Sequence, residues 1–279
     1  MPAASTVVAV ALAAVAAAGA LRWGLPAALR ALGLHRPYRG PRFALPGRRA
    51  LIVTTSHASP GPKGGPTGVF ASEMTAPYYA FVDAGVDVDL ASIAGGPIPI
   101  DPESFRWYVE TPSDRRFRAD PVAQAKAGRS LRIDDVDVAA YDLVFLAGGW
   151  GAAYDLGTSD ALGRGLSRAW AAGRVVGGVC HGPLGLLNAR DADGAPLVRG
   201  RRLTAVTDRQ VAQLGIRSTP QHPERELRAA GAVFECAHAP LEVTANHVTV
   251  DGRLVTGQNQ NAGEEAAQRM LEAAGGTPR

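Results

Sequence analysis

The stretch VVGGVCHGP, residues 175–183, decides the fold and holds the first candidate for chemistry. Its first five residues are small or apolar, a composition typical of a strand buried on both faces of a parallel sheet. Cys180 follows, and residues 181–189 predict a helix. A strand that runs into a nucleophile and then directly into a helix has the geometry of the serine elbow of hydrolases, here with sulfur in place of oxygen.

Buried strands and helices alternate on both sides of this stretch. Residues 95–132, rich in Pro, Asp and Arg, are expected to form an irregular insertion or lid. The alternation predicts an α/β fold, a three-layer α/β/α sandwich around a mostly parallel sheet. The expected strands span 51–55, 86–92, 143–147, 174–179, 203–206, 241–250 and 254–256, and the expected helices 69–84, 161–172, 181–189, 224–230 and 262–273.

The two cysteines, Cys180 and Cys236, are too few for a disulfide scaffold. One bond between them stays open, but the setting of Cys180 favours a free thiol. At a helix N-terminus a thiol meets unpaired N–H groups and the positive end of the helix dipole, which favour the thiolate. The alternative is a buried cysteine that acts as a small apolar side chain. The flanking glycines and His181 favour catalysis instead.

His181 is the natural proton carrier beside Cys180, with a capping or core histidine as the alternative. A catalytic histidine needs an orienting carboxylate. Asp208, just after an expected strand, is the candidate, and capping of the next helix is its other interpretation. Glu73 lies on a predicted helix amid apolar neighbours, where burial would raise its pKa and let it exchange a proton with the sulfur. On its own it reads as a surface glutamate.

The cluster Gly148-Gly149-Trp150-Gly151 follows the strand expected at 143–147. Its backbone N–H groups are suited to stabilising an oxyanion, and a strand-ending turn is the alternative. No GxGxxG or GxxxxGK[ST] motif occurs, so nucleotide binding is unsupported. Four other histidines lack metal-ligand spacing, so neither a metal nor another cofactor is expected; they are His57, His222, His238 and His247.

The net charge of +3 is unevenly distributed. Residues 1–50 hold seven Arg and no acidic residue, which leaves 22 basic and 26 acidic side chains in the rest of the chain. A mildly acidic body argues against nucleic-acid binding, because that requires Lys and Arg clustered on the domain itself.

The chain divides into residues 1–49, an apolar segment with an Arg-rich linker, and residues 50–279, one domain. Residues 3–21 carry no charge, and this length reaches the lower end of what spans a bilayer. The Arg residues that follow predict a membrane anchor with the domain on the cytoplasmic side. A cleaved signal peptide of a secreted protein is the alternative, although the basic residues that usually precede one are missing. An Ala-rich helix of a cytoplasmic protein is the third interpretation.

Five segments, in this order, resemble the PfpI-like (parkinsonism-associated deglycase) superfamily. Its flavodoxin-like architecture is the class I glutamine amidotransferase-like fold. The likeness covers about residues 50–273 and is greatest to the glutathione-independent glyoxalase (glyoxalase III) branch. The segments are TGVFASEMTAPYYAFVDAGVDVDLAS, DVDVAAYDLVFLAGGWGAAYDL, VVGGVCHGP, LTAVTD and DGRLVTGQN.

The resemblance implies Cys180 as nucleophile, His181 beside it, Glu73 as the carboxyl group that touches the sulfur, and Asp208 as the third member. It further implies a homodimer and a cofactor-free conversion of a small carbonyl compound, such as methylglyoxal, to D-lactate through a hemithioacetal. An amide hydrolase, or a stress chaperone or redox sensor, are the alternatives. Trp150 departs from the pattern, because the family often has His there.

Overall fold

The computed structural model describes residues 4–216 and 218–279. Its centre is a seven-stranded sheet in the order β4-β3-β2-β5-β6-β10-β9, in which every pair is parallel except β10 with β9. The mostly parallel α/β sheet expected from the sequence is confirmed. The strands are β2 (Arg49–Thr54), β3 (Asp87–Ser92), β4 (Leu131–Arg132), β5 (Leu143–Leu146), β6 (Val175–Val179), β9 (Val248–Asp251) and β10 (Leu254–Gly257).

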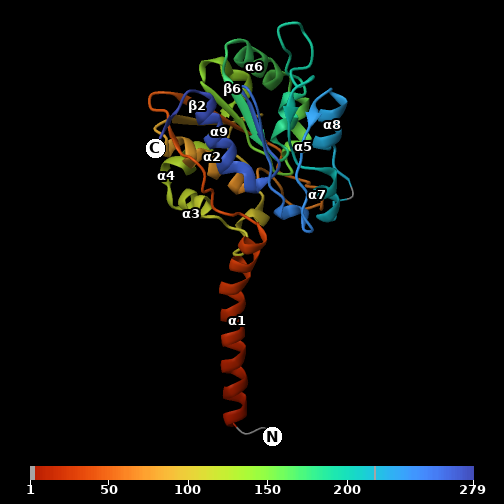
Figure 1. Ribbon diagram of the computed structural model, residues 1–279. Helices are drawn as coiled ribbons and strands as arrows, with labels where there is room; N and C mark the ends of the chain where they lie inside the picture. Colours follow the sequence, from red (N-terminus) through yellow and green to blue (C-terminus); the bar gives the residue numbers. More distant parts are fainter. Residues whose placement is uncertain (1–3, 217) are drawn as a thin grey trace.

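Helices cover both faces of the sheet, which gives the three layers (Figure 1). In β2, Ala50 and Ile52 point into one hydrophobic cluster, while Leu51 and Val53 point into the other. This two-sided burial is the reason that the strand is apolar without alternation. The first cluster includes side chains of α2 (Ala71–Asp83) and α9 (Gly263–Ala273), and the second includes those of α6 (Asp160–Ala171).

Residues 95–132 are more regular than expected. They contain η1 (Pro102–Phe105), α3 (Pro112–Ala119) and α4 (Pro121–Gly128). The start signals are present in the sequence, because Thr111 and Asp120 cap the two α-helices and a proline follows each.

Three other segments differ from their predictions. The helix expected at 181–189 is reduced to the 3-10 helix η5 (Gly182–Leu186). The strand expected at 203–206 is the short β7 (Arg202–Leu203), which pairs with β8 (Val233–Phe234) outside the main sheet. Much of the strand expected at 241–250 is loop and the 3-10 helix η6 (Glu242–Thr244), because the Glu242 side chain is buried among polar partners.

The remaining short elements connect these layers. They are α5 (Ala152–Asp155), α7 (Asp208–Gln213) and α8 (Pro223–Ala229), with the 3-10 helices η2 (Ile133–Asp135), η3 (Val138–Ala140), η4 (Leu156–Thr158) and η7 (Gln260–Ala262).

The N-terminal helix α1 (Ala4–Leu32) stands away from the domain as a stalk (Figure 1). Apolar side chains on it are exposed, among them Leu12 at 65% and Trp23 at 81%. It is the helix among the described residues that is long and apolar enough to cross a membrane, a property that signal sequences share.

The chain after α1 is attached to the domain, although residues 36–49 were expected to be a linker. The His35 N–H donates to Asn261 Oδ1 at 2.7 Å, and the Phe43 N–H donates to Gln268 Oε1 at 3.0 Å. β1 (Phe43–Ala44) pairs antiparallel with β11 (Thr277–Pro278).

Candidate active site

The elbow predicted at Cys180 is present. β6 ends at Val179, and Cys180 adopts a φ of 58°, in the left-handed region that a non-glycine residue rarely occupies. Its N–H donates to the Gly257 carbonyl at 3.1 Å, and its carbonyl accepts from the Val206 N–H at 3.0 Å. These two bonds hold a conformation that costs about 1–2 kcal/mol, and such strain concentrates at functional sites.

Glycines allow the neighbouring strands to approach this elbow. A Cβ on Gly178 would lie 2.5 Å from the Leu146 carbonyl oxygen, and one on Gly182 would lie 2.0 Å from the same atom. Both distances are far inside van der Waals contact, so these positions exclude any side chain. The glycines that frame Cys180 in the sequence therefore bring the end of β5 against the nucleophile.

His181 lies beside the thiol. Its Nδ1 is 3.3 Å from Cys180 Sγ, both residues are buried, and the Trp150 ring lies 4.7 Å from the imidazole, centroid to centroid. Burial lowers the pKa of His181 to about 3, with a smaller contribution from the charge on His222. The imidazole is therefore neutral near pH 7. Its Nε2 is buried and has no hydrogen-bond partner among the described residues.

Glu73 approaches from the first turn of α2. It is 1% exposed, and burial raises its pKa to about 8, against the opposing effects of the Cys180 thiol and the N–H groups of Gly149 and Gly148. A Cβ on Gly148 would lie 2.4 Å from Glu73 Oε2, so this glycine leaves the room that the carboxyl group occupies. Glu73 is consequently protonated near pH 7 and has a proton to donate.

The expected thiolate is not favoured in the free protein. Burial, followed by the charge of Glu73, raises the pKa of Cys180 well above its ordinary value, although the N–H groups of Gly149 and His181 act in the opposite direction. The helix that was expected to supply a dipole is the short η5. Cys180 is thus a neutral thiol between a neutral imidazole and a protonated carboxyl group.

Asp208 is not where the sequence analysis expected it. Its carboxylate accepts from Arg225 Nε at 2.5 Å and lies 3.2 Å from His222 Nδ1. It does not cap α7 either, because Thr207 does so in a capping box with Gln210. Since Asp208 begins α7 and points to α8 and the residue before it, the structure does not bring it to His181.

The glycine cluster after β5 serves two purposes. Gly149, at φ 95°, has an N–H group that lowers the pKa of both Cys180 and Glu73, and Trp150 lies against His181. Gly151 is a packing position instead, because a Cβ there would lie 2.6 Å from Thr55 Cγ2. Gly149 and Trp150 therefore belong to the site, Gly148 leaves room for Glu73, and Gly151 supports the turn from outside.

A cavity of about 590 Å³ opens onto these groups. Its lining includes Cys180, His181 and Glu73, together with Leu34 and His35 from the segment after α1. His35 was missed by the sequence analysis, since nothing near residue 35 marks a site. Burial and, less, the charge of Arg30 lower its pKa to about 4, so it is neutral near pH 7. Its Nε2 has no hydrogen-bond partner among the described residues.

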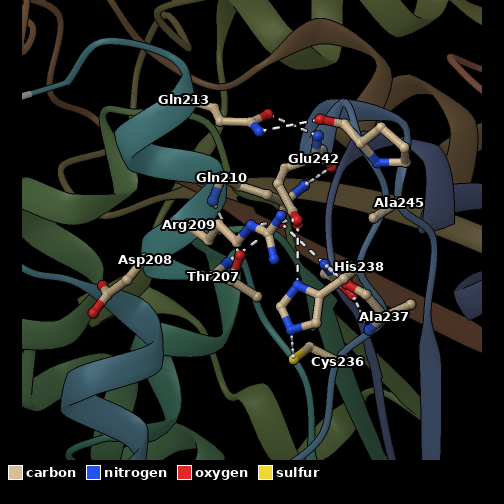
Figure 2. A network of polar contacts seen from close by, with 12 residues as sticks. Thr207, Asp208, Arg209, Gln210, Gln213, Cys236, Ala237, His238, Glu242 and Ala245 are labelled. Atoms are coloured by element: carbon tan, nitrogen blue, oxygen red, sulfur yellow. Dashed lines mark hydrogen bonds and ion pairs between the residues drawn. The ribbon is translucent and has the colours of Figure 1, made fainter.

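A second polar network, drawn in Figure 2, includes Gln210, which lines this cavity. Gln210 donates from Nε2 to the Glu242 carbonyl at 2.8 Å. The fully buried Glu242 carboxylate lies 2.8 Å from Arg209 Nε and 3.3 Å from His238 Nδ1, and His238 Nε2 lies 3.5 Å from Cys236 Sγ. Within the described part of the chain, no group of His, Cys, Asp and Glu is arranged to hold a metal ion.

Comparison with known proteins places this chain in a family. The chain is similar to glutathione-independent glyoxalase hsp3102 of Schizosaccharomyces pombe, with 27% identity over 237 residues, covering 81% of this chain and 98% of the relative. Glyoxalase 3 of Candida albicans is 27% identical over 248 residues, again covering 81% and 98%.

Two solved structures are similar to this chain over most of its length. Rapid Encystment Protein 24 KDa of Francisella tularensis has a TM-score of 0.75 and 29% identity, covering 81% of this chain and 99% of that one. Glyoxalase III of Candida albicans has a TM-score of 0.71 at 24% identity, covering 81% and 97%, which shows a common fold. Residues 66–273 match the DJ-1/PfpI family, and the chain belongs to it.

Proposed function

We propose that this protein is a glyoxalase III-like enzyme that converts a small dicarbonyl such as methylglyoxal to D-lactate, with Cys180 as nucleophile and no cofactor. The names of its relatives support the reaction class. The observation that carries the proposal is the Cys180 thiol beside His181 Nδ1 at 3.3 Å and the protonated Glu73, at the base of a cavity.

The first step adds the thiol to the aldehyde. Sγ bonds to the aldehyde carbon while the thiol proton passes to the carbonyl oxygen, which yields a neutral hemithioacetal. His181 relays this proton, and the N–H groups of Gly149 and His181, which favour negative charge at this position by lowering the pKa of Cys180, stabilise the charge that develops on the oxygen. A neutral thiol fits this step, because proton and nucleophile leave together.

The second step moves a proton between adjacent carbons. The neutral imidazole of His181 takes the proton from the carbon bound to sulfur, which gives an enediolate with its negative charge on the neighbouring oxygen. The imidazolium returns this proton to the neighbouring carbon, while the hydroxyl proton of the sulfur-bearing carbon passes to the neighbouring oxygen. Glu73, protonated near pH 7, donates a hydrogen bond to the oxygen that carries the negative charge. The product is a thioester of the 2-hydroxy acid. Water then attacks the thioester carbon, which releases lactate and restores the thiol.

Lactate production from methylglyoxal tests this reaction. We expect Cys180→Ala to lower kcat/KM by about 10³-fold or more, and Cys236→Ala to stay within about twofold of the wild type. A chiral assay identifies the D enantiomer. Undiminished lactate from Cys180→Ala would overturn the mechanism.

Amide hydrolysis has weaker support. In that reaction the histidine is held by a carboxylate, and Asp208 is instead engaged by His222 and Arg225. Ammonia release from glutamine and other amides, measured beside lactate, separates the two reactions. A stress chaperone or redox sensor remains the third candidate. Suppression of client aggregation that survives Cys180→Ala, without turnover, supports it.

We further infer membrane attachment through α1 with the domain on the cytoplasmic side. The exposed apolar side chains of α1 and the Arg residues from Arg22 to Arg49 support it. We expect the full chain to stay in the membrane fraction after washing with alkaline carbonate. We also expect an added protease to digest the domain only after the cells have been opened. Release of the chain by carbonate would favour a cytoplasmic protein. A mature protein that lacks α1 would favour a secreted protein with a cleaved signal peptide. A homodimer is also proposed, and light scattering in detergent tests it.

A further inference from the structure

The cavity above Cys180 is larger than the proposed small substrate needs. A volume of about 590 Å³ falls in the range of pockets that bind drug-sized ligands. Methylglyoxal has five non-hydrogen atoms and occupies a small part of this space. The remaining volume has room for a substrate that is larger than methylglyoxal.

The chemistry of the lining indicates what that part is. Of the charged residues in the lining, Lys63, Glu103 and Arg106 are exposed. Asp101 is buried, and its carboxylate already accepts from Thr67 and from the Glu103 N–H. Away from the reacting groups the buried and half-buried walls are mostly aliphatic or aromatic, formed by Leu29, Leu34, Phe70, Val109, Val206 and Ile216. Such a surface binds apolar chain and gains little from a small polar molecule.

The end of α1 supplies part of this apolar wall. Leu29, on the last turns of α1, and Leu34 line the cavity together with Val109. The same three side chains meet again in a small adjoining gap between α1 and the segment that precedes α3. Residues 29 and 34 lie outside the range 66–273 that matches the family. The segment before the matched range thus also contributes to the site.

His35 adds a polar contact inside this wall. Its neutral Nε2 is buried without a partner among the described residues, and its ring stacks on Phe70 with centroids 6.4 Å apart.

We propose that the Cys180 cavity accepts α-oxoaldehydes with a long apolar tail, whose dicarbonyl head reaches Sγ while the tail lies against Leu29, Leu34 and Val109. The inference rests on the proposed function and names its substrate class. The reaction is unchanged: the oxoaldehyde and one water give the 2-hydroxy acid, with no oxidant or reductant. Such compounds come either from water or from a bilayer, and the exposed apolar surface of α1 places the cavity mouth beside a bilayer if α1 is inserted.

The experiment compares 2-oxododecanal with methylglyoxal on the full chain, with each 2-hydroxy acid product measured. Burial of one methylene group changes affinity about fourfold, so a few buried methylenes predict a kcat/KM at least 100-fold higher for the long substrate. Leu34→Asn should lower the ratio of the two kcat/KM values at least tenfold. Leu32→Asn is the matched control, because Leu32 is 57% exposed and does not line the cavity; the ratio should stay within twofold.

The outcomes separate the two proposals. Turnover of methylglyoxal with no gain for 2-oxododecanal, or a ratio that Leu34→Asn leaves unchanged, overturns the apolar-tail inference and leaves the proposed function intact. No product from either substrate overturns both. The source is tested with the full chain in phosphatidylcholine vesicles. A higher rate when 2-oxododecanal is in the same vesicles than in separate ones indicates supply from the bilayer, and equal rates indicate supply from water.

Discussion

Two cysteine–histidine pairs lie in this molecule, and their local contacts are nearly the same. Cys180 Sγ is 3.3 Å from a ring nitrogen of His181, and Cys236 Sγ is 3.5 Å from one of His238. A glutamate is close to each pair, Glu73 in the first and Glu242 in the second. The types of residue therefore do not tell the two apart.

Their surroundings differ. Around Cys236 the charged group is neutralised by its neighbours, since Glu242 Oε2 lies 3.3 Å from His238 Nδ1, and Glu242 Oε1, which makes no hydrogen bond among the described residues, forms an ion pair with Arg209 Nε at 2.8 Å (Figure 2). Around Cys180, Nε2 of His181 and Oε2 of Glu73 are buried without partners among the described residues, next to a cavity. A network whose charges are paired stabilises a fold, whereas unpartnered groups at a cavity are available to a substrate.

The largest expected effect distinguishes the two histidines. His181→Asn should lower kcat/KM by about 10²–10⁴-fold, because it removes the proton carrier beside the thiol. His238→Asn, which is outside the cavity, should stay within about twofold. Steady-state kinetics of both variants checks this, and equal losses would contradict a catalytic role confined to the Cys180–His181 pair.

The next effect concerns the space around Glu73. Gly148→Ala places a Cβ 2.4 Å from Glu73 Oε2 and 2.7 Å from the backbone nitrogen of His181. This overpacking should lower the free energy of unfolding by about 2–3 kcal/mol. Gly128→Ala is the control, because no atom lies within 4 Å of its added Cβ. Urea denaturation measures both. A Gly148→Ala protein as stable as the control would mean that the carboxyl group lies elsewhere.

A third effect is a pH dependence specific to the first pair. The pKa of Glu73 rises from 4.5 to about 8 on folding, so the folded state holds a proton that the unfolded state has lost. Its contribution is complete below pH 4.5 and disappears as the pH rises through 8. Between pH 6.5 and 8 the free energy of unfolding should fall by up to about 1.4 kcal/mol per pH unit.

Glu73→Gln should flatten this slope, measured by urea denaturation at several pH values. The window starts at 6.5 because His181, whose pKa falls from 6.5 to about 3, acts with the opposite sign below it. An identical slope in wild type and variant would contradict a protonated Glu73.

The smallest effect tests the second network as a structural one. Arg209→Gln removes the partner of a carboxylate that is 0% exposed, while Arg209 itself is 58% exposed. Solvent screening at the arginine limits the expected loss of stability to about 1 kcal/mol, with kcat/KM within twofold. A large loss of activity at unchanged stability would assign a catalytic role to the Arg209 network.

Much of the sheet could be predicted, because β2, β5 and β6 are buried on both faces and their continuous apolar runs are a local signal. The elbow at Cys180 was likewise visible in its glycines. The predictions are wrong where contacts between residues far apart in the sequence determine the local structure. The apolar alternation near Val243 predicts a strand, but burial of Glu242 against Arg209 makes a turn.

The site shows the same division. Glu73 was found by its place on an apolar helix, whereas Asp208 was assigned by its position after a strand, and the side chain turns to Arg225 instead. The pKa of Cys180 depends on burial, which a helix-dipole argument from sequence does not include. His35 reaches the cavity through the docking of a whole segment, for which no local pattern exists.

The short pairing of β1 with β11 has a mechanical consequence. A force along α1 reaches the domain first through the bonds of His35 to Asn261 and Phe43 to Gln268, and then through the two-residue ladder of β1 with β11. These contacts transmit the force to α9 and to η7, which precedes it, and not directly to the central sheet. Traction on α1 should therefore displace Leu34 and His35 from the cavity before it unfolds the catalytic domain. A force on the helix would thus change the shape of the cavity while the domain stays folded.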